Sequence, residues 1–94
     1  MEMKTESLTN NILISKAVVK NGKCKIYTLL KLLDVSGNTS YSLMVTSVEK
    51  DVCNNVFVND FSRNKEFALK VFWHIVDGNI SSDRITDTIE SFIE

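Results

Sequence analysis

The sequence predicts an α+β domain in which a four-stranded antiparallel meander is followed by two C-terminal helices packed on one face of the sheet. Three observations lead to this prediction. Asn21-Gly22 separates two apolar-rich runs and is the strongest short-range signal for a β-hairpin, because both central residues of a type I′ turn need a positive φ. Residues 63–77 are apolar around most of a helical circumference. Residues 82–94 place apolar side chains on one helical face and acidic side chains on the other.

The hairpin turn fixes the register of the first two predicted strands, residues 11–20 and 23–33. A two-residue loop places Lys20 opposite Lys23, and every second pair after it shares the same face. All five lysines of this hairpin therefore fall on one side of the sheet, and we expect the helices to cover the opposite, more apolar side. A shift of one residue would bury the lysines. The further pairs expected on the lysine side are Val18 with Lys25, Lys16 with Tyr27, Ile14 with Leu29, and Ile12 with Lys31.

Two more strands complete the predicted sheet. A turn at 35–39 precedes a third strand at 41–48, in which apolar and smaller residues alternate. A polar connection at 49–55 then leads into a short β-branched and aromatic strand at 56–58.

The two helices have recognisable ends. Ser62 is the expected N-cap of the first helix, and Gly78 is expected to end it in the left-handed conformation. Ser81 is the expected N-cap of the second helix, with Ile80 and Ile85 at the spacing of a hydrophobic staple. The second helix has an apolar stripe of Ile85, Ile89, Phe92 and Ile93 and an acidic face of Asp83, Asp87, Glu90 and Glu94.

Several of these features together resemble a known group of proteins. They are Phe61-Ser62 at a strand-to-helix junction, Ala68 within an apolar helix, Asn79 after the glycine, and the isoleucine-rich segment 85–93. In these features residues 41–94 resemble a family of small uncharacterised proteins, a domain of unknown function, from low-GC Gram-positive, clostridia-like bacteria. The resemblance implies a small intracellular bacterial protein and supplies no catalytic residues. Family members often carry a proline after the loop between the helices, whereas this chain has Ile80-Ser81-Ser82 there.

Length and composition indicate one soluble domain. Ninety-four residues support a single modest core, and we expect residues 1–10 to form a flexible arm. The net charge of −1 conceals an asymmetry, because residues 1–50 hold seven lysines and four acids whereas residues 51–94 hold four basic and eight acidic residues. The sequence shows neither a signal peptide nor an apolar run of transmembrane length, so we expect a cytoplasmic protein without membrane association.

No residue pattern indicates catalysis, a metal site or a cofactor. His74 is the only histidine, and Cys24 and Cys53 lie in distant segments without metal-ligand spacing or a flanking catalytic motif. The glycines are isolated and form no phosphate-binding loop. We therefore predict that the protein is not an enzyme.

The lysine side of the first hairpin is the candidate binding surface. Its lysines, together with Tyr27, are suited to acidic protein groups or phosphates; the alternative is a solvated face that discourages edge-to-edge aggregation. Ile12, Ile14 and Leu29 would form an exposed apolar patch on the same side, requiring cover by a second copy, another protein or the N-terminal arm. The candidate binding residues are Lys16, Lys20, Lys23, Lys25, Tyr27, Lys31, Ile12, Ile14 and Leu29.

The leading functional hypothesis is a small regulator or inhibitor of a protein partner. Such a protein could be encoded by a bacterium, a mobile element or a phage, and an inhibitor of a CRISPR effector or another defence nucleoprotein is one example. The alternative is a nucleic-acid-binding module that uses the lysine side, although the absence of arginine there argues against base-specific readout. A homodimer, in which the acidic helix face of one copy meets the lysine side of another, is a further alternative.

Overall fold

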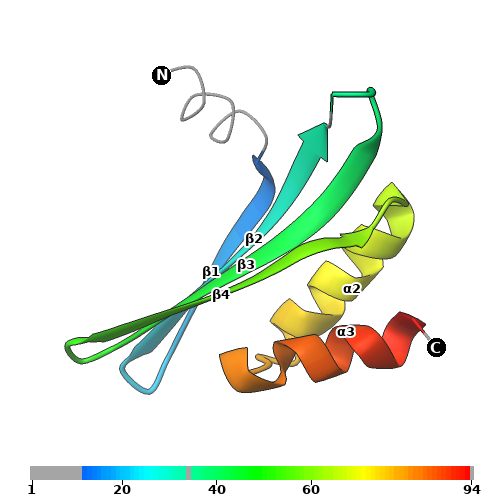
Figure 1. The fold of residues 1–94 in the computed structure, drawn as a ribbon. Coiled ribbons are helices and arrows are strands. Elements are labelled where there is room, and N and C mark those ends of the chain that lie inside the picture. Colours follow the sequence, from blue (N-terminus) through cyan, green and yellow to red (C-terminus); the bar gives the residue numbers. More distant parts are fainter. Residues whose placement is uncertain (1–11, 34, 94) are drawn as a thin grey trace, which may run out of the picture.

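The structure is a computed structural model that describes residues 12–33 and 35–93. The four strands are β1 (Ile12–Lys20), β2 (Lys23–Leu33), β3 (Thr39–Glu49) and β4 (Val52–Ser62), and they form one antiparallel sheet in the order β1-β2-β3-β4. They are followed by α2 (Lys65–Asp77), the 3₁₀ turn η1 (Ser82–Arg84) and α3 (Ile85–Ile93), and both helices lie on one side of the sheet (Figure 1). The predicted fold class is confirmed. The predicted arm at 1–10 and the acidic residue Glu94 lie outside the described residues.

The β1–β2 and β3–β4 hairpins have two-residue turns. Asn21 and Gly22 have φ angles of 54° and 78°, as the type I′ prediction requires. The second turn consists of Lys50, with a φ of 56°, and Asp51. The predicted polar connection at 49–55 is therefore wrong, because β4 begins at Val52 and continues the ladder directly from Glu49.

Irregularities in the ladder bend both edge strands. In β1 the register shifts between Ile12 and Ile14, so that Ile12 pairs with Leu30 and not with Lys31 as predicted. A second irregularity places three residues of β4, 59–61, opposite Ser42 of β3.

The side chain of Ser42 holds the irregular part of β4 in place by two hydrogen bonds. Its buried hydroxyl accepts a hydrogen bond from the Asp60 N–H (2.9 Å) and donates one to Asn59 Oδ1 (3.1 Å). Asp60 is in the left-handed region with a φ of 52°. The extra residues of β4 interrupt the backbone hydrogen bonds between β4 and β3. The Ser42 hydroxyl provides the Asp60 N–H with an acceptor in their place.

The helices cover the lysine side of the sheet, and the prediction that they cover the opposite side is wrong. Tyr27 and Leu29 share the lysine side, and both are fully buried in the core. Their neighbours on β3 are Val45 and Leu43, also fully buried, so the centre of this side is apolar across the inner strands. The lysines lie on the edge strand and toward the strand ends. The core consists of Tyr27, Leu29, Tyr41, Leu43, Val45, Phe61, Ala68, Val71, Phe72, Ile75, Val76, Ile85 and Ile89.

The start of α2 differs by two residues from its prediction. The N-cap is Asn64, whose Oδ1 accepts a hydrogen bond from the Phe67 N–H at 2.9 Å, and not Ser62. Ser62 instead accepts a hydrogen bond from the Asn64 N–H through its hydroxyl. An amide oxygen caps a helix as well as a hydroxyl does, and Asn64 stands closer to the first helical residue.

The end of α2 and the start of η1 set the shape of the connecting loop. The prediction that Gly78 is left-handed is wrong, because Gly78 has a right-handed φ of −82° and the left-handed residue is Asn79, with a φ of 51°. Ser81 precedes η1 as expected, but its hydroxyl donates to the Asp83 carboxylate (2.6 Å) and makes no cap hydrogen bond. Ile80 packs against the core that contains Ile85, which places both residues of the predicted staple on the apolar interior.

Candidate functional site

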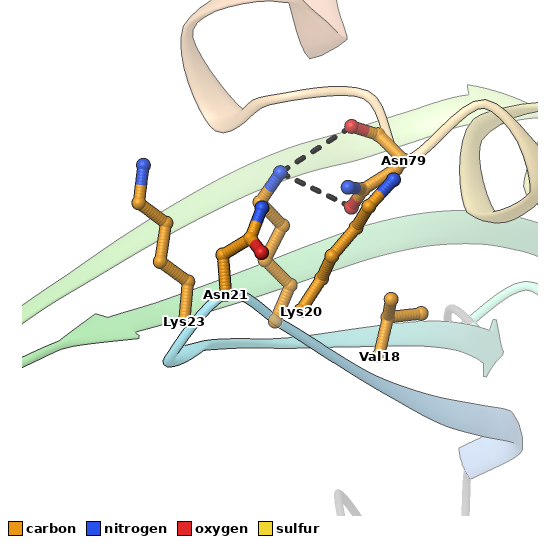
Figure 2. A pocket seen from close by; sticks show the side chains of 6 residues that line it. Val18, Lys20, Asn21, Lys23 and Asn79 are labelled. Atoms are coloured by element: carbon orange, nitrogen blue, oxygen red, sulfur yellow. Dashed lines mark hydrogen bonds between the residues drawn. The ribbon is translucent and has the colours of Figure 1, made fainter.

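Three lysines of the first hairpin line a cavity of about 240 Å³ beside the loop that follows α2. We call this cavity the lysine cleft. Figure 2 shows the side chains of Lys20 and Lys23 rising from the hairpin on the side of the sheet where Asn79 lies. The lining residues of the lysine cleft are Val18, Lys20, Asn21, Lys23, Lys25 and Asn79.

The hairpin turn brings the lysines together. Lys20 and Lys23 are opposite each other across the type I′ turn, and Lys25 follows two residues later on the same face. Asn21 in the turn also lines the cleft and adds a side-chain amide to it. The local sequence therefore gathers three ammonium groups and an amide at one end of the sheet.

Asn79 closes the cleft from the helical side. Lys25 Nζ donates to the backbone oxygen (3.3 Å) and to Oδ1 (3.2 Å) of Asn79. The Tyr27 hydroxyl donates to the Ile80 carbonyl oxygen at 3.0 Å and also lies 3.3 Å from Asn79 Oδ1. The left-handed conformation of Asn79 directs both of its oxygens toward β2, so two β2 side chains hold the loop against the sheet.

Tyr27 supports the cleft from below without lining it. Its side chain is fully buried, and burial raises the pKa of its phenol above the ordinary value. The hydroxyl therefore remains a neutral donor to the loop carbonyl at physiological pH.

The cleft carries an excess of positive charge. Lys23 Nζ lies 3.8 Å from Glu49 Oε2, and both side chains are about half exposed, so this ion pair contributes little stability. Within residues 12–33 and 35–93, neither Lys20 nor Lys25 is in an ion pair. Of these three ammonium groups only that of Lys23 is in an ion pair, and the charge of Lys25 also helps to lower the pKa of the Asp83 carboxyl.

A second cavity of about 200 Å³ adjoins the cleft, and Lys23 and Lys25 line both. Ser47 Oγ is buried and has no hydrogen-bond partner within the described part of the chain. A buried hydroxyl without a partner is uncommon. The residues lining this second cavity are Lys23, Cys24, Lys25, Ser47, Val48, Glu49, Asn54, Ser81 and Ser82.

The structure brings together only some of the predicted binding residues. Lys16 and Lys31 are exposed but do not line the cleft. The predicted apolar patch is wrong, because Leu29 is fully buried and Ile14 packs against the core, although Ile12 remains 46% exposed. The helices cover the apolar surface on which a binding partner was expected.

The asparagines of the cleft were missed by the sequence reasoning. Asn21 was assigned only to the turn, although a turn residue beside two lysines is a signal for a polar pocket. Asn79 lies 54 residues from Lys25 in the chain, and only its position after a helix-ending glycine singled it out.

Several other polar and titratable groups do not line the cleft. His74 is exposed on α2, with its ring centroid 4.9 Å from that of Phe92. Cys24 and Cys53 are free thiols on strands that β3 separates. Asp83, Asp87 and Glu90 are exposed, as expected for the acidic face of the last helix.

In the described ranges, no group of three His, Cys, Asp or Glu side chains is arranged to hold a metal ion. No helix in these ranges is long and apolar enough to cross a membrane.

Comparisons with protein-family models, with curated proteins and with solved structures gave no match to this chain.

Proposed function

We propose that this chain is a non-enzymatic protein-binding module that regulates or inhibits a partner by holding an acidic side chain of that partner in the lysine cleft. The observation that carries the proposal is the gathering of Lys20, Lys23 and Lys25 around one cavity, where only Lys23 is in an ion pair within the described residues. A carboxylate entering the cleft would meet the ammonium group of Lys20, which within the described residues has neither an ion pair nor a hydrogen bond to Asn79. The other two lysines and the side-chain amides would be further hydrogen-bond donors beside it.

The cleft is better suited to binding a small acidic group than to binding a long polyanion such as DNA. Double-stranded DNA presents about one charge per 1.7 Å of axis, and its binding uses cations distributed along that length. Here Lys25 is engaged by Asn79 and Lys23 faces Glu49, which leaves Lys20 as the cleft lysine without either contact. Because Lys25 and Lys23 already have polar partners, the cleft is better suited to binding a single carboxylate than to binding a long polyanion.

Nucleic-acid binding is the second candidate, because Lys16 and Lys31 extend the positive charge along the same side of the sheet. If the protein binds nucleic acid, the exposed lysines outside the cleft must contribute as much to the binding affinity as those inside it. The two proposals therefore differ in their response to changes at Lys31.

The test is an affinity pull-down from a nuclease-treated lysate of cells that naturally produce the protein, read by mass spectrometry. The chain is used as wild type, as Lys20→Glu in the cleft, and as Lys31→Glu outside it. Both lysines are exposed on the lysine side of the hairpin, so the two variants change the same charge on the same face.

We expect one dominant protein that Lys20→Glu loses and Lys31→Glu retains. Equal retention by both variants would contradict the role of the cleft. If nuclease treatment abolishes recovery and both variants weaken binding to a DNA oligonucleotide, with a steep dependence on salt, the nucleic-acid candidate replaces the proposal.

A further inference from the structure

The side of the sheet away from the helices is an uncharged surface. We call it the outer face and define it by three ladder rows toward the two hairpin turns. No described element covers this side in Figure 1, where α2 and α3 both lie against the other. The rows are Val19, Cys24, Val48 and Cys53; Ala17, Ile26, Thr46 and Asn55; and Ser15, Thr28, Met44 and Phe57.

The outer face departs from the composition of the chain. Charged residues make up 24% of the sequence, yet none stands at these twelve positions. Several large apolar residues on the outer face are accessible, with Val19 73% and Phe57 52% exposed, and Ile26 and Val48 each 37% exposed. The side chains on the solvent-exposed face of an antiparallel sheet are normally polar or charged. An apolar exposed face therefore indicates a contact surface.

We propose that the outer face binds the outer face of a second copy of this chain and forms a symmetric, face-to-face dimer. An uncharged surface requires a partner surface that is also uncharged, since burying an unpaired charge against it is unfavourable. The same face of a second copy meets this requirement at every position. A two-fold axis through the outer face closes the assembly at two subunits.

The area is sufficient for a weak specific dimer. Four strands about 4.8 Å apart and about 20 Å of strand length give a patch of about 400 Å² in projection. Pleating and side-chain relief raise the accessible surface removed from both copies to about 1,000 Å², at the lower end of specific interfaces. Two twisted sheets meet in this way at about −30°, as in a β-sandwich. We therefore expect a concentration-dependent dimer with a Kd of about 1–100 μM.

The dimer would give the protein two outward binding sites. The lysine cleft opens on the helix side, so stacking the outer faces leaves both clefts on opposite external surfaces. Two clefts in one particle bind a partner that presents two acidic groups more tightly than either cleft alone. This consequence rests on the proposed function, whereas the dimer itself does not.

The test is sedimentation equilibrium of the full chain from about 5 to about 500 μM, a range that spans the expected Kd. Val19→Glu places a charge on the outer face at an exposed position, and Val35→Glu makes the same change at a fully exposed residue of the β2–β3 turn, outside that face. We expect Val19→Glu to raise the dimer Kd at least tenfold and Val35→Glu to leave it unchanged. Lys20→Glu should also leave it unchanged, which separates this inference from the proposed function.

Cys53 provides an independent measurement on the same face. Its thiol is free, and the residue is exposed on β4. We expect its rate of alkylation by a maleimide to fall several-fold as the wild-type protein dimerises, and to stay constant with concentration in Val19→Glu. A wild-type chain that remains monomeric over the whole range, or a Val19→Glu dimer of wild-type affinity, would overturn the proposal.

Discussion

Replacing Asn79 by glycine and by alanine separates the hydrogen bonds of this residue from its backbone conformation. Asn79 has a φ of 51° and accepts hydrogen bonds from Lys25 and Tyr27 through its side chain. Glycine removes the side-chain acceptor but adopts the left-handed conformation freely. Alanine removes the same acceptor and also resists that conformation.

The expected losses follow from the contacts that remain. In Asn79→Gly, the Tyr27 hydroxyl keeps the Ile80 carbonyl and Lys25 keeps the backbone oxygen of residue 79. Because both donors keep a second acceptor, loss of the two partly exposed hydrogen bonds to Oδ1 should lower the unfolding free energy by only about 1 kcal/mol in total. Asn79→Ala adds about 1 kcal/mol for the left-handed backbone, giving about 2 kcal/mol in total.

Urea denaturation followed by tryptophan fluorescence measures both values. Trp73 is the only tryptophan, and its ring lies 5.2 Å from that of Phe72, which is fully buried in the core, so its emission reports loss of packing. A difference of 1 kcal/mol corresponds to about 4–8 °C in the melting temperature of a domain of this size. Equal stability of the two variants would refute the argument from the left-handed conformation. Wild-type stability in both would refute the contribution of the hydrogen bonds.

Three further predictions concern single hydroxyl groups. Ser42→Ala leaves the Asp60 N–H without its acceptor, and we expect a loss of about 1–3 kcal/mol in urea denaturation. Tyr27 has a raised folded-state pKa, so its contribution to stability is complete below the unfolded pKa of about 10 and is lost as pH rises through the folded pKa. We expect Tyr27→Phe to be less stable at neutral pH and to show a shallower alkaline decline. The Ser81 hydroxyl lowers the pKa of the Asp83 carboxyl, and we expect Ser81→Ala to raise that pKa in an NMR titration.

Each of these predictions has a result that contradicts it. A loss below about 0.5 kcal/mol in Ser42→Ala would show that the Ser42 hydroxyl does not hold β4 in place. An alkaline decline of unchanged steepness in Tyr27→Phe would show that the buried phenol is not the group responsible. An unchanged carboxyl titration in Ser81→Ala would place the cause of the low Asp83 pKa elsewhere, for example in the nearby charges of Arg84 and Lys25.

The part of the candidate site that lies within one hairpin was predictable. The Asn21-Gly22 turn fixes its own register, so the proximity of Lys20, Lys23 and Lys25 follows from two residues of sequence. The participation of Asn79 was not predictable in the same way, because its contact with Lys25 spans 54 residues.

The covered face of the sheet could have been inferred from β3. Its alternation places Tyr41, Leu43 and Val45 on one side and smaller or more polar residues on the other. This pattern decides the face only if the pairing of β3 with β2 is known. The five-residue connection 34–38 does not fix that pairing, whereas a two-residue turn does.

The sequence by itself determined the elements of this protein, because turn residues, caps and hydrophobic periodicity act over a few neighbouring positions. It determined the two helices and the common face of the five lysines, although the tight two-residue turn between β3 and β4, which has no glycine, escaped prediction. Only the tertiary structure decided which face is buried. The helices pack where the inner strands offer the largest continuous apolar area, around Leu29 and Leu43, so the lysines are displaced to the rim and become the walls of a cleft.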